Sequence, residues 1–185
     1  QEGIKSPDSD GYYSLYEYGL KMPIPENYKI ERNIYADGWS TRMEKDDQNH
    51  IVVTERLIDE GLSYEVFIRN TVKEMNTSFG KKIMKLKSRK IHSEKYDYFN
   101  LDKAIIAGLT MEAFKEEFIK EKGKEEYDKE YEKIIKTEKG AGIVVFMREL
   151  NDGEFLNIEL TYSNEESQSE LMKIIREATS IINQN

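Results

Sequence analysis

Two apolar runs joined by a turn decide the fold: Gly142-Ile-Val-Val-Phe-Met-Arg-Glu-Leu150 and Glu154-Phe-Leu-Asn-Ile-Glu-Leu-Thr-Tyr162, on either side of Asn151-Asp152-Gly153. An Asp-Gly pair between apolar runs is a strong hairpin signal, because the turn needs positive φ at its centre. The second run alternates polar and apolar residues, as a half-exposed strand does. Residues 143–147 are apolar throughout, which predicts a central strand covered on both faces. We therefore expect an antiparallel hairpin inside a larger sheet.

An amphipathic helix is predicted directly after this hairpin. Ser163 is the expected first cap, with Glu166 three residues on as in a capping box. The apolar positions then recur at helical spacing: Leu171, Ile174, Ile175, Ala178, Ile181 and Ile182. A hairpin followed by such a helix indicates an α+β domain, in which helices pack on a mainly antiparallel central sheet.

The rest of the chain is predicted to contain further strands and one long helix. The helix begins at Ser63 and ends near Gly80, where a C-terminal glycine is expected. The first strand stops at Pro23 and Pro25, because proline cannot donate to a strand ladder. Ala104-Ile-Ile-Ala107 is predicted to be the buried part of the last strand before the hairpin. The predicted strands lie at 12–24, 28–34, 39–44, 50–57, 81–91 and 96–110.

Residues 111–139 form a charged helical insertion. More than half of them are charged, with both signs interleaved, and their apolar positions are sparse. The pairs Phe114/Phe118 and Tyr127/Tyr131 are spaced four residues apart, which indicates two helical pieces. Gly123 separates the two pieces. A narrow apolar stripe packs lightly, so we expect the insertion to lie across the surface of the domain.

Composition limits the class of protein. The chain has 185 residues, enough for one domain with a substantial core, and a formal net charge of -8. Such an acidic balance argues against general binding of nucleic acid, which needs a basic surface. Cysteine is absent, and no apolar run approaches the length of a membrane span. We expect a polar tether at 1–11 and a single domain over 12–185.

Three stretches of this sequence resemble the PsbP-like family. Tyr18-Gly-Leu-Lys-Met-Pro-Ile-Pro-Glu-Asn-Tyr28 is similar to the family's opening strand and its proline-rich exit. Residues 96–107 are similar to a strand entered from a short polar turn, and 153–182 to the closing strand and amphipathic helix. The family includes an extrinsic protein of photosystem II, a Ran-binding nuclear import factor, bacterial lipoproteins and secretion adaptors.

The resemblance implies an α/β/α sandwich without catalytic machinery. It implies a binding or accessory role, with protein partners and no cofactor, in a bacterial cell-envelope protein or lipoprotein. The polar stretch 1–11 would suit a tether outside the cytoplasm. An intracellular adaptor or chaperone, acting on a secreted or GTPase-type partner, is the alternative. No ligand residue of the family can be carried over position by position.

Candidate catalytic and metal-binding residues are few. His50 and His92 are the two histidines, and each stands apart from acidic residues at ligand spacing. Gly140-Ala-Gly142 precedes a predicted strand instead of opening a helix, so it does not resemble a phosphate-binding loop. A hydrolase would have to use carboxylates that no motif singles out. We therefore expect a protein that is not an enzyme.

Two groups of residues are the candidate partner surface, because they depart most from what the fold requires. A basic stretch within this acidic chain is suited to an acidic partner or an anionic surface. Its alternative role is to prevent pairing at the edge of the sheet. The aromatic residues of the insertion form the other group. The candidate residues are Lys81, Lys82, Lys85, Lys87, Arg89, Lys90, Phe114, Phe118, Tyr127 and Tyr131.

Overall fold

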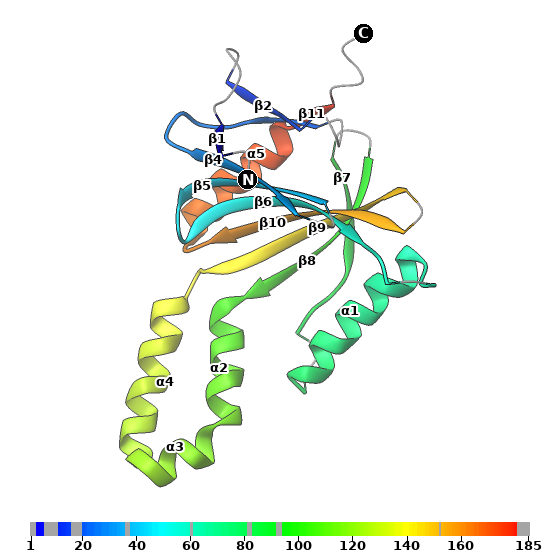
Figure 1. Cartoon of the computed structure of the whole chain (residues 1–185). Coiled ribbons are helices and arrows are strands. Elements are labelled where there is room, and N and C mark those ends of the chain that lie inside the picture. Colours follow the sequence, from blue (N-terminus) through cyan, green and yellow to red (C-terminus); the bar gives the residue numbers. More distant parts are fainter. Residues whose placement is uncertain are drawn as a thin grey trace.

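The computed structural model shows a large antiparallel sheet with helices on both faces (Figure 1). It describes residues 3–5, 11–15, 20–35, 38–59, 61–80, 83–91, 94–151 and 153–180. Part of the predicted tether is a strand, because Gly3–Lys5 pairs with the edge of the sheet. Residues 1–2 and 6–10 of that stretch lie outside the described residues.

The large sheet has eight strands in the order β1-β4-β5-β6-β10-β9-β8-β7, and every neighbouring pair is antiparallel. A small sheet has three strands in the order β11-β3-β2. The predicted hairpins around residues 45–49 and 151–153 are confirmed as β5–β6 and β9–β10. The strands are Gly3–Lys5 (β1), Tyr12–Leu15 (β2), Leu20–Pro23 (β3), Lys29–Tyr35 (β4), Gly38–Asp46 (β5), Asn49–Leu57 (β6), Lys87–Ile91 (β7), Glu94–Asp102 (β8), Gly142–Asn151 (β9), Glu154–Tyr162 (β10) and Thr179–Ser180 (β11).

Five helices are present in the described part of the chain: Tyr64–Ser78 (α1), Lys103–Ala113 (α2), Lys115–Lys122 (α3), Lys124–Glu138 (α4) and Glu165–Glu177 (α5). The predicted start of α1 is confirmed, because the Ser63 hydroxyl oxygen accepts a hydrogen bond from the backbone N–H of Val66 at 3.3 Å. The predicted end is also confirmed. Gly80 follows the helix with φ of 64°, a conformation that glycine adopts without strain.

The cap of α5 differs from the prediction. Asn164 is the N-cap, and its side-chain oxygen accepts a hydrogen bond from the backbone N–H of Ser167 at 2.8 Å. Ser163 instead donates from its backbone N–H and its hydroxyl to the side-chain oxygen of Asn49. This contact ties the start of α5 to the β5–β6 turn, so a tertiary partner overrides the local capping signal.

The end of α5 and the first predicted strand also differ from the prediction. The helix ends at Glu177, because Thr179–Ser180 pairs with β3. Ile181 and Ile182, expected on its apolar stripe, lie outside the described residues. The single strand predicted over 12–24 is a pair of antiparallel strands, β2 and β3.

The two faces of the large sheet bury two separate clusters of apolar side chains, as an α/β/α sandwich requires. On one face the sheet packs against α5 and the small sheet. On the other face it packs against α1, and the Phe67 and Phe155 rings lie 5.0 Å apart. The alternation in β9 confirms that it is a central strand: Val144 and Phe146 belong to the first cluster, and Val145 and Met147 to the second.

The start of β9 has no room for a side chain. A Cβ atom on Gly142 would lie 2.7 Å from the backbone oxygen of Leu101 and would overlap the Tyr162 hydroxyl. The backbone oxygen belongs to the neighbouring strand and cannot turn away. We expect Gly142→Ala to lower the free energy of unfolding by about 1–3 kcal/mol, measured by urea denaturation, as overpacking does.

Gly61→Asn is the control for this substitution. A Cβ atom on Gly61 meets nothing within 4 Å, and asparagine tolerates the positive φ of 84° found there. We expect this variant to lie within about 0.5 kcal/mol of the original protein. Equal losses of stability in the two variants would contradict the close packing at Gly142.

Candidate functional site

A helical arm leaves the sheet between two neighbouring strands. β8 ends at Asp102, β9 begins at Gly142, and these two residues are register partners. Between them α2, α3 and α4 fold back on one another and extend away from the sheet (Figure 1). Antiparallel neighbours can be joined by a turn of about two residues, so the sheet does not require this excursion. We call residues 103–138 the arm.

The arm begins where the sequence predicts a strand, and the prediction for Ala104-Ile-Ile-Ala107 is wrong. These residues form the first turns of α2. The Asp102 carboxylate accepts hydrogen bonds from the backbone N–H groups of Ala104 and Ile105, at 2.9 and 3.3 Å. An aspartate in front of an apolar run satisfies the free N–H groups of a helix and complements its dipole. That cap is the signal that would have identified the helix.

The interior of the arm is a small aromatic cluster. The Phe118 and Tyr127 rings meet edge to face at 5.7 Å, and the Tyr127 and Tyr131 rings lie 6.0 Å apart. Gly108 lets α2 approach α4, because a Cβ atom there would lie 3.2 Å from the ends of Ile135 and Tyr131. The arm is therefore held together by its own contacts. It projects from the sheet and does not lie across the surface as predicted.

The candidate aromatic residues divide between the interior and the surface of the arm. Tyr127 is 4% exposed and lies in the interior, so its side chain is not available to a partner. Phe118 and Tyr131 are half-buried. Phe114 is 58% exposed at the junction of α2 and α3. Ile105 is 55% exposed. The sequence predicted it in a buried strand, so it was not among the candidate surface residues.

The basic stretch is a strand over part of its length. Lys87, Arg89 and Lys90 lie on β7, at the edge of the large sheet. Lys85 is exposed in the segment before the strand, so the predicted strand over 81–91 is shorter than expected. The ammonium group of Lys87 lies 5.9 Å from the centre of the Tyr98 ring. Lys81 and Lys82 lie outside the described residues.

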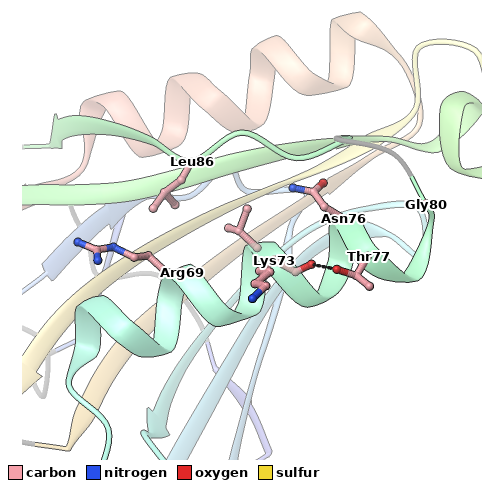
Figure 2. Close-up of a pocket in the computed structure, with 7 residues that line it drawn as sticks. Arg69, Lys73, Asn76, Thr77, Gly80 and Leu86 are labelled. Atoms are coloured by element: carbon pink, nitrogen blue, oxygen red, sulfur yellow. Dashed lines mark hydrogen bonds between the residues drawn. The ribbon is translucent and has the colours of Figure 1, made fainter.

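An open groove lies between α1 and the segment that leads to β7 (Figure 2). Its volume is about 670 Å³, in the range of pockets that hold ligands. We call it the α1 groove. Composition and periodicity did not indicate it, because its two walls are joined through tertiary contacts. It is lined by Arg69, Val72, Lys73, Asn76, Thr77, Gly80 and Leu86.

Asn76 holds the two walls of the α1 groove together. Its side-chain oxygen accepts hydrogen bonds from the backbone N–H groups of Ile83 and Met84, both at 2.8 Å. Its side-chain nitrogen donates to the backbone oxygen of Met84 at 3.1 Å. One amide side chain thus gives this short segment the hydrogen bonds that a neighbouring strand would supply.

A second pocket, of about 550 Å³, is rich in acidic residues, of which Asp46 and Glu170 accept hydrogen bonds. It lies between the β5–β6 turn and the start of α5. The Glu170 carboxylate accepts from the Tyr28 hydroxyl at 3.2 Å and from the Lys45 ammonium at 2.9 Å. Hydrogen bonds from Asn49, and then from the backbone, hold the pKa of Asp46 below its usual range. These carboxylates fasten the turn to the helix.

His50 lies beside Arg42 in this fold. Burial, and then the positive charge of Arg42, lower its pKa. Its Nδ1 atom lies 3.2 Å from an Arg42 nitrogen. His92 lies outside the described residues. Among the residues that the structure describes, no group of three or more His, Asp or Glu side chains is placed to hold a metal ion.

Glu55 and Glu154 lie close to one another at the other end of β6. Burial, and then the hydrogen bond with Glu154, raise the pKa of Glu55. Two such groups cannot both ionise without repulsion. The folded protein therefore holds a proton there more tightly than the unfolded chain does.

Comparison with known proteins concerns the fold. No family model and no curated protein matches the chain. Among solved structures, the chain is similar to cyanobacterial PsbP (CyanoP) from Synechocystis sp. PCC 6803, over 97% of this chain and 94% of that one, with 8% identity and a TM-score of 0.46. No helix within the described ranges is both long and apolar enough to cross a membrane.

Removing the Asn76 side chain tests its role in the α1 groove. We expect Asn76→Ala to leave the backbone groups of Ile83 and Met84 without partners and to cost about 1–3 kcal/mol in the free energy of unfolding. Hydrogen exchange at those two amides should become faster. Thr77→Ala is the matched control, because the exposed Thr77 hydroxyl donates to the Lys73 backbone oxygen of its own helix. Unchanged exchange in Asn76→Ala would contradict this role.

The Glu55–Glu154 pair predicts a pH-dependent stability. Because the pKa of Glu55 is raised on folding, stability falls as the pH rises from the unfolded pKa through the folded one. We expect Glu55→Gln to be more stable than the original protein at pH 7, by up to about 1 kcal/mol. The difference should vanish below about pH 3, where the carboxyl is protonated in both states.

Glu159→Gln is the control for this pH dependence, since its register partners are Val52 and Val145. Its effect on thermal stability, measured at the same two pH values, is the baseline against which the effect of Glu55→Gln is compared. A Glu55→Gln variant that is less stable than the original protein at pH 7 would contradict the raised pKa of Glu55.

Proposed function

We propose that this protein is a non-catalytic accessory module that binds a partner protein through the arm. The observation that carries the proposal is the position of the arm between Asp102 and Gly142, which a short turn could join. Segments that connect the elements of a rigid scaffold often carry binding residues. The arm stabilises itself through its aromatic cluster and presents a charged surface with Phe114 at its bend.

The basic strand β7 is the second part of this proposed surface. Lys87 and Lys90 are exposed at the edge of the large sheet, in a chain with a net charge of -8. Basic side chains at an edge discourage pairing with a second copy, since like charges would face one another. The same side chains attract an acidic protein or an anionic surface.

We further propose that the protein works outside the cytoplasm, as a cell-envelope protein. The resemblance of the sequence to a family with many bacterial lipoproteins supports this. An intracellular adaptor or chaperone is the alternative. Fractionation of the source cells, with the protein detected by antibody, separates the two: recovery in the cytoplasmic fraction would favour the adaptor.

Replacing the arm by a turn tests whether it serves the fold or a partner. In the variant, Asn-Gly joins Asp102 to Gly142. We expect it to unfold cooperatively, because both clusters that flank the large sheet consist mainly of residues outside the arm. Circular dichroism measures this. Co-purification of partners from the source cells should be lost, and retention of every partner would overturn the proposal.

Photocrosslinking at Phe114 tests the surface of the intact arm. A photoreactive phenylalanine analogue at position 114 should give a defined crosslinked product in the source cells, because this side chain is 58% exposed at the bend of the arm. Leu57, at the end of β6, is 59% exposed and is the matched control. Products of equal yield from both positions would show that the arm has no preferred role.

A further inference from the structure

We propose that the α1 groove binds an extended acidic segment of a partner protein. An apolar side chain of the segment would lie on Val72 and Leu86, with carboxylates beside Arg69 and Lys73. This inference rests on the proposed role as a binding module. The α1 groove would be a second binding surface, apart from the arm, and its ligand would be an acidic peptide segment.

The dimensions of the groove fit a short extended peptide. One wall is α1 from Arg69 to Thr77, which spans about 12 Å at the rise of an α-helix. An extended chain covers that length with about four residues. The volume of about 670 Å³ is large enough for the side chains on one face of such a segment.

The floor of the groove is apolar, and its polar groups already have partners. Val72 and Leu86 are half-buried and pack against the cluster beneath α1. The Asn76 side chain is bonded to the backbone of Ile83 and Met84. Figure 2 shows Leu86 pointing toward α1 and the Thr77 hydroxyl bonded within the helix. The floor can therefore receive an apolar side chain without leaving polar groups unsatisfied.

The charge of the groove selects an acidic occupant. Arg69 and Lys73 line it, and no carboxylate is among the described residues that line it. Glu65, one turn earlier on α1, lies 3.6 Å from Arg69, with side-chain exposures of 80% and 73%. Exposed pairs of this kind are weak and screened by salt, so Arg69 can exchange Glu65 for a ligand carboxylate. A basic groove on a chain of net charge -8 is complementary to an acidic segment.

An extended segment satisfies both requirements at once. Side chains in an extended chain alternate between two sides, so apolar residues at every second position can face the floor. The residues between them then reach toward the rim, where Arg69 and Lys73 lie. Recognition of extended peptides commonly combines such alternate side-chain pockets with charge selection.

Fluorescence anisotropy with labelled peptides tests the proposal on the full chain. The probe is the peptide Glu-Leu-Glu-Leu-Glu, compared with Lys-Leu-Lys-Leu-Lys and Glu-Ser-Glu-Ser-Glu. We expect the first peptide to bind, with NMR shifts at Val72 and Leu86, and both others to bind at least about tenfold more weakly. Binding should weaken as salt concentration rises.

Charge reversal in the groove supplies the matched comparison. Arg69→Glu with Lys73→Glu should weaken binding of the acidic peptide at least about tenfold. Lys173→Glu with Arg176→Glu makes the same change in charge on exposed positions of α5, on the other side of the sheet, and should leave binding unchanged. Circular dichroism confirms that both variants are folded.

Three results would overturn the inference. They are no binding of the acidic peptide, equal binding of the basic one, and equal loss of binding in the two charge-reversed variants. Vesicles of phosphatidylglycerol, compared with phosphatidylcholine, form a further arm of the test. Vesicle binding that depends on Arg69 and Lys73, without peptide binding, would assign the groove to a lipid surface. Failure here leaves the arm-replacement experiment unaffected, so the two proposals fail separately.

Discussion

The fold depends on the burial of β9 on both faces. Val144 and Phe146 contact the cluster beneath α5, while Val145 and Met147 contact the cluster beneath α1. A strand that is apolar on both sides can be stable in water only when both sides are covered. The position of β9 between β10 and β8 meets this condition. Helices on one face and a small sheet with α5 on the other then follow as the covers.

The same strand explains how the arm can be large without disturbing the sheet. Its base is narrow, because Asp102 caps α2 at the end of β8 and Gly142 begins β9 directly opposite. The backbone N–H of Lys103 donates to the backbone oxygen of Ala141 at 3.1 Å, which closes this base. Beyond it, Tyr127 and its neighbours stabilise the arm internally. The pairing of β8 with β9 is therefore complete at the base of the arm. The arm is not needed for this pairing and can serve a different role.

The local sequence patterns predicted most helices and strands correctly. The predictions were wrong where contacts with other parts of the fold determine the secondary structure. The β9–β10 hairpin, the β5–β6 hairpin and α1 followed from turn residues, alternation and caps, which act over a few residues. Residues 104–107 are apolar enough for a buried strand, yet they are helical because Asp102 caps them and their helix packs on α4 at Gly108. The N-cap of α5 lies one residue later than predicted, because Ser163 forms a hydrogen bond with the side chain of Asn49.

By itself the sequence determined the α+β class, the two hairpins, the long helices and the presence of a charged insertion, because periodicity and turn chemistry are local properties. It also identified Phe114 and the basic residues of β7 as candidates for contact. Which aromatic side chains of the arm are buried depends on the tertiary structure. Tyr127, for example, becomes buried only when α3 and α4 pack together. The tertiary structure also created the α1 groove, because Asn76 joins a helix to a segment that no local pattern connects to it.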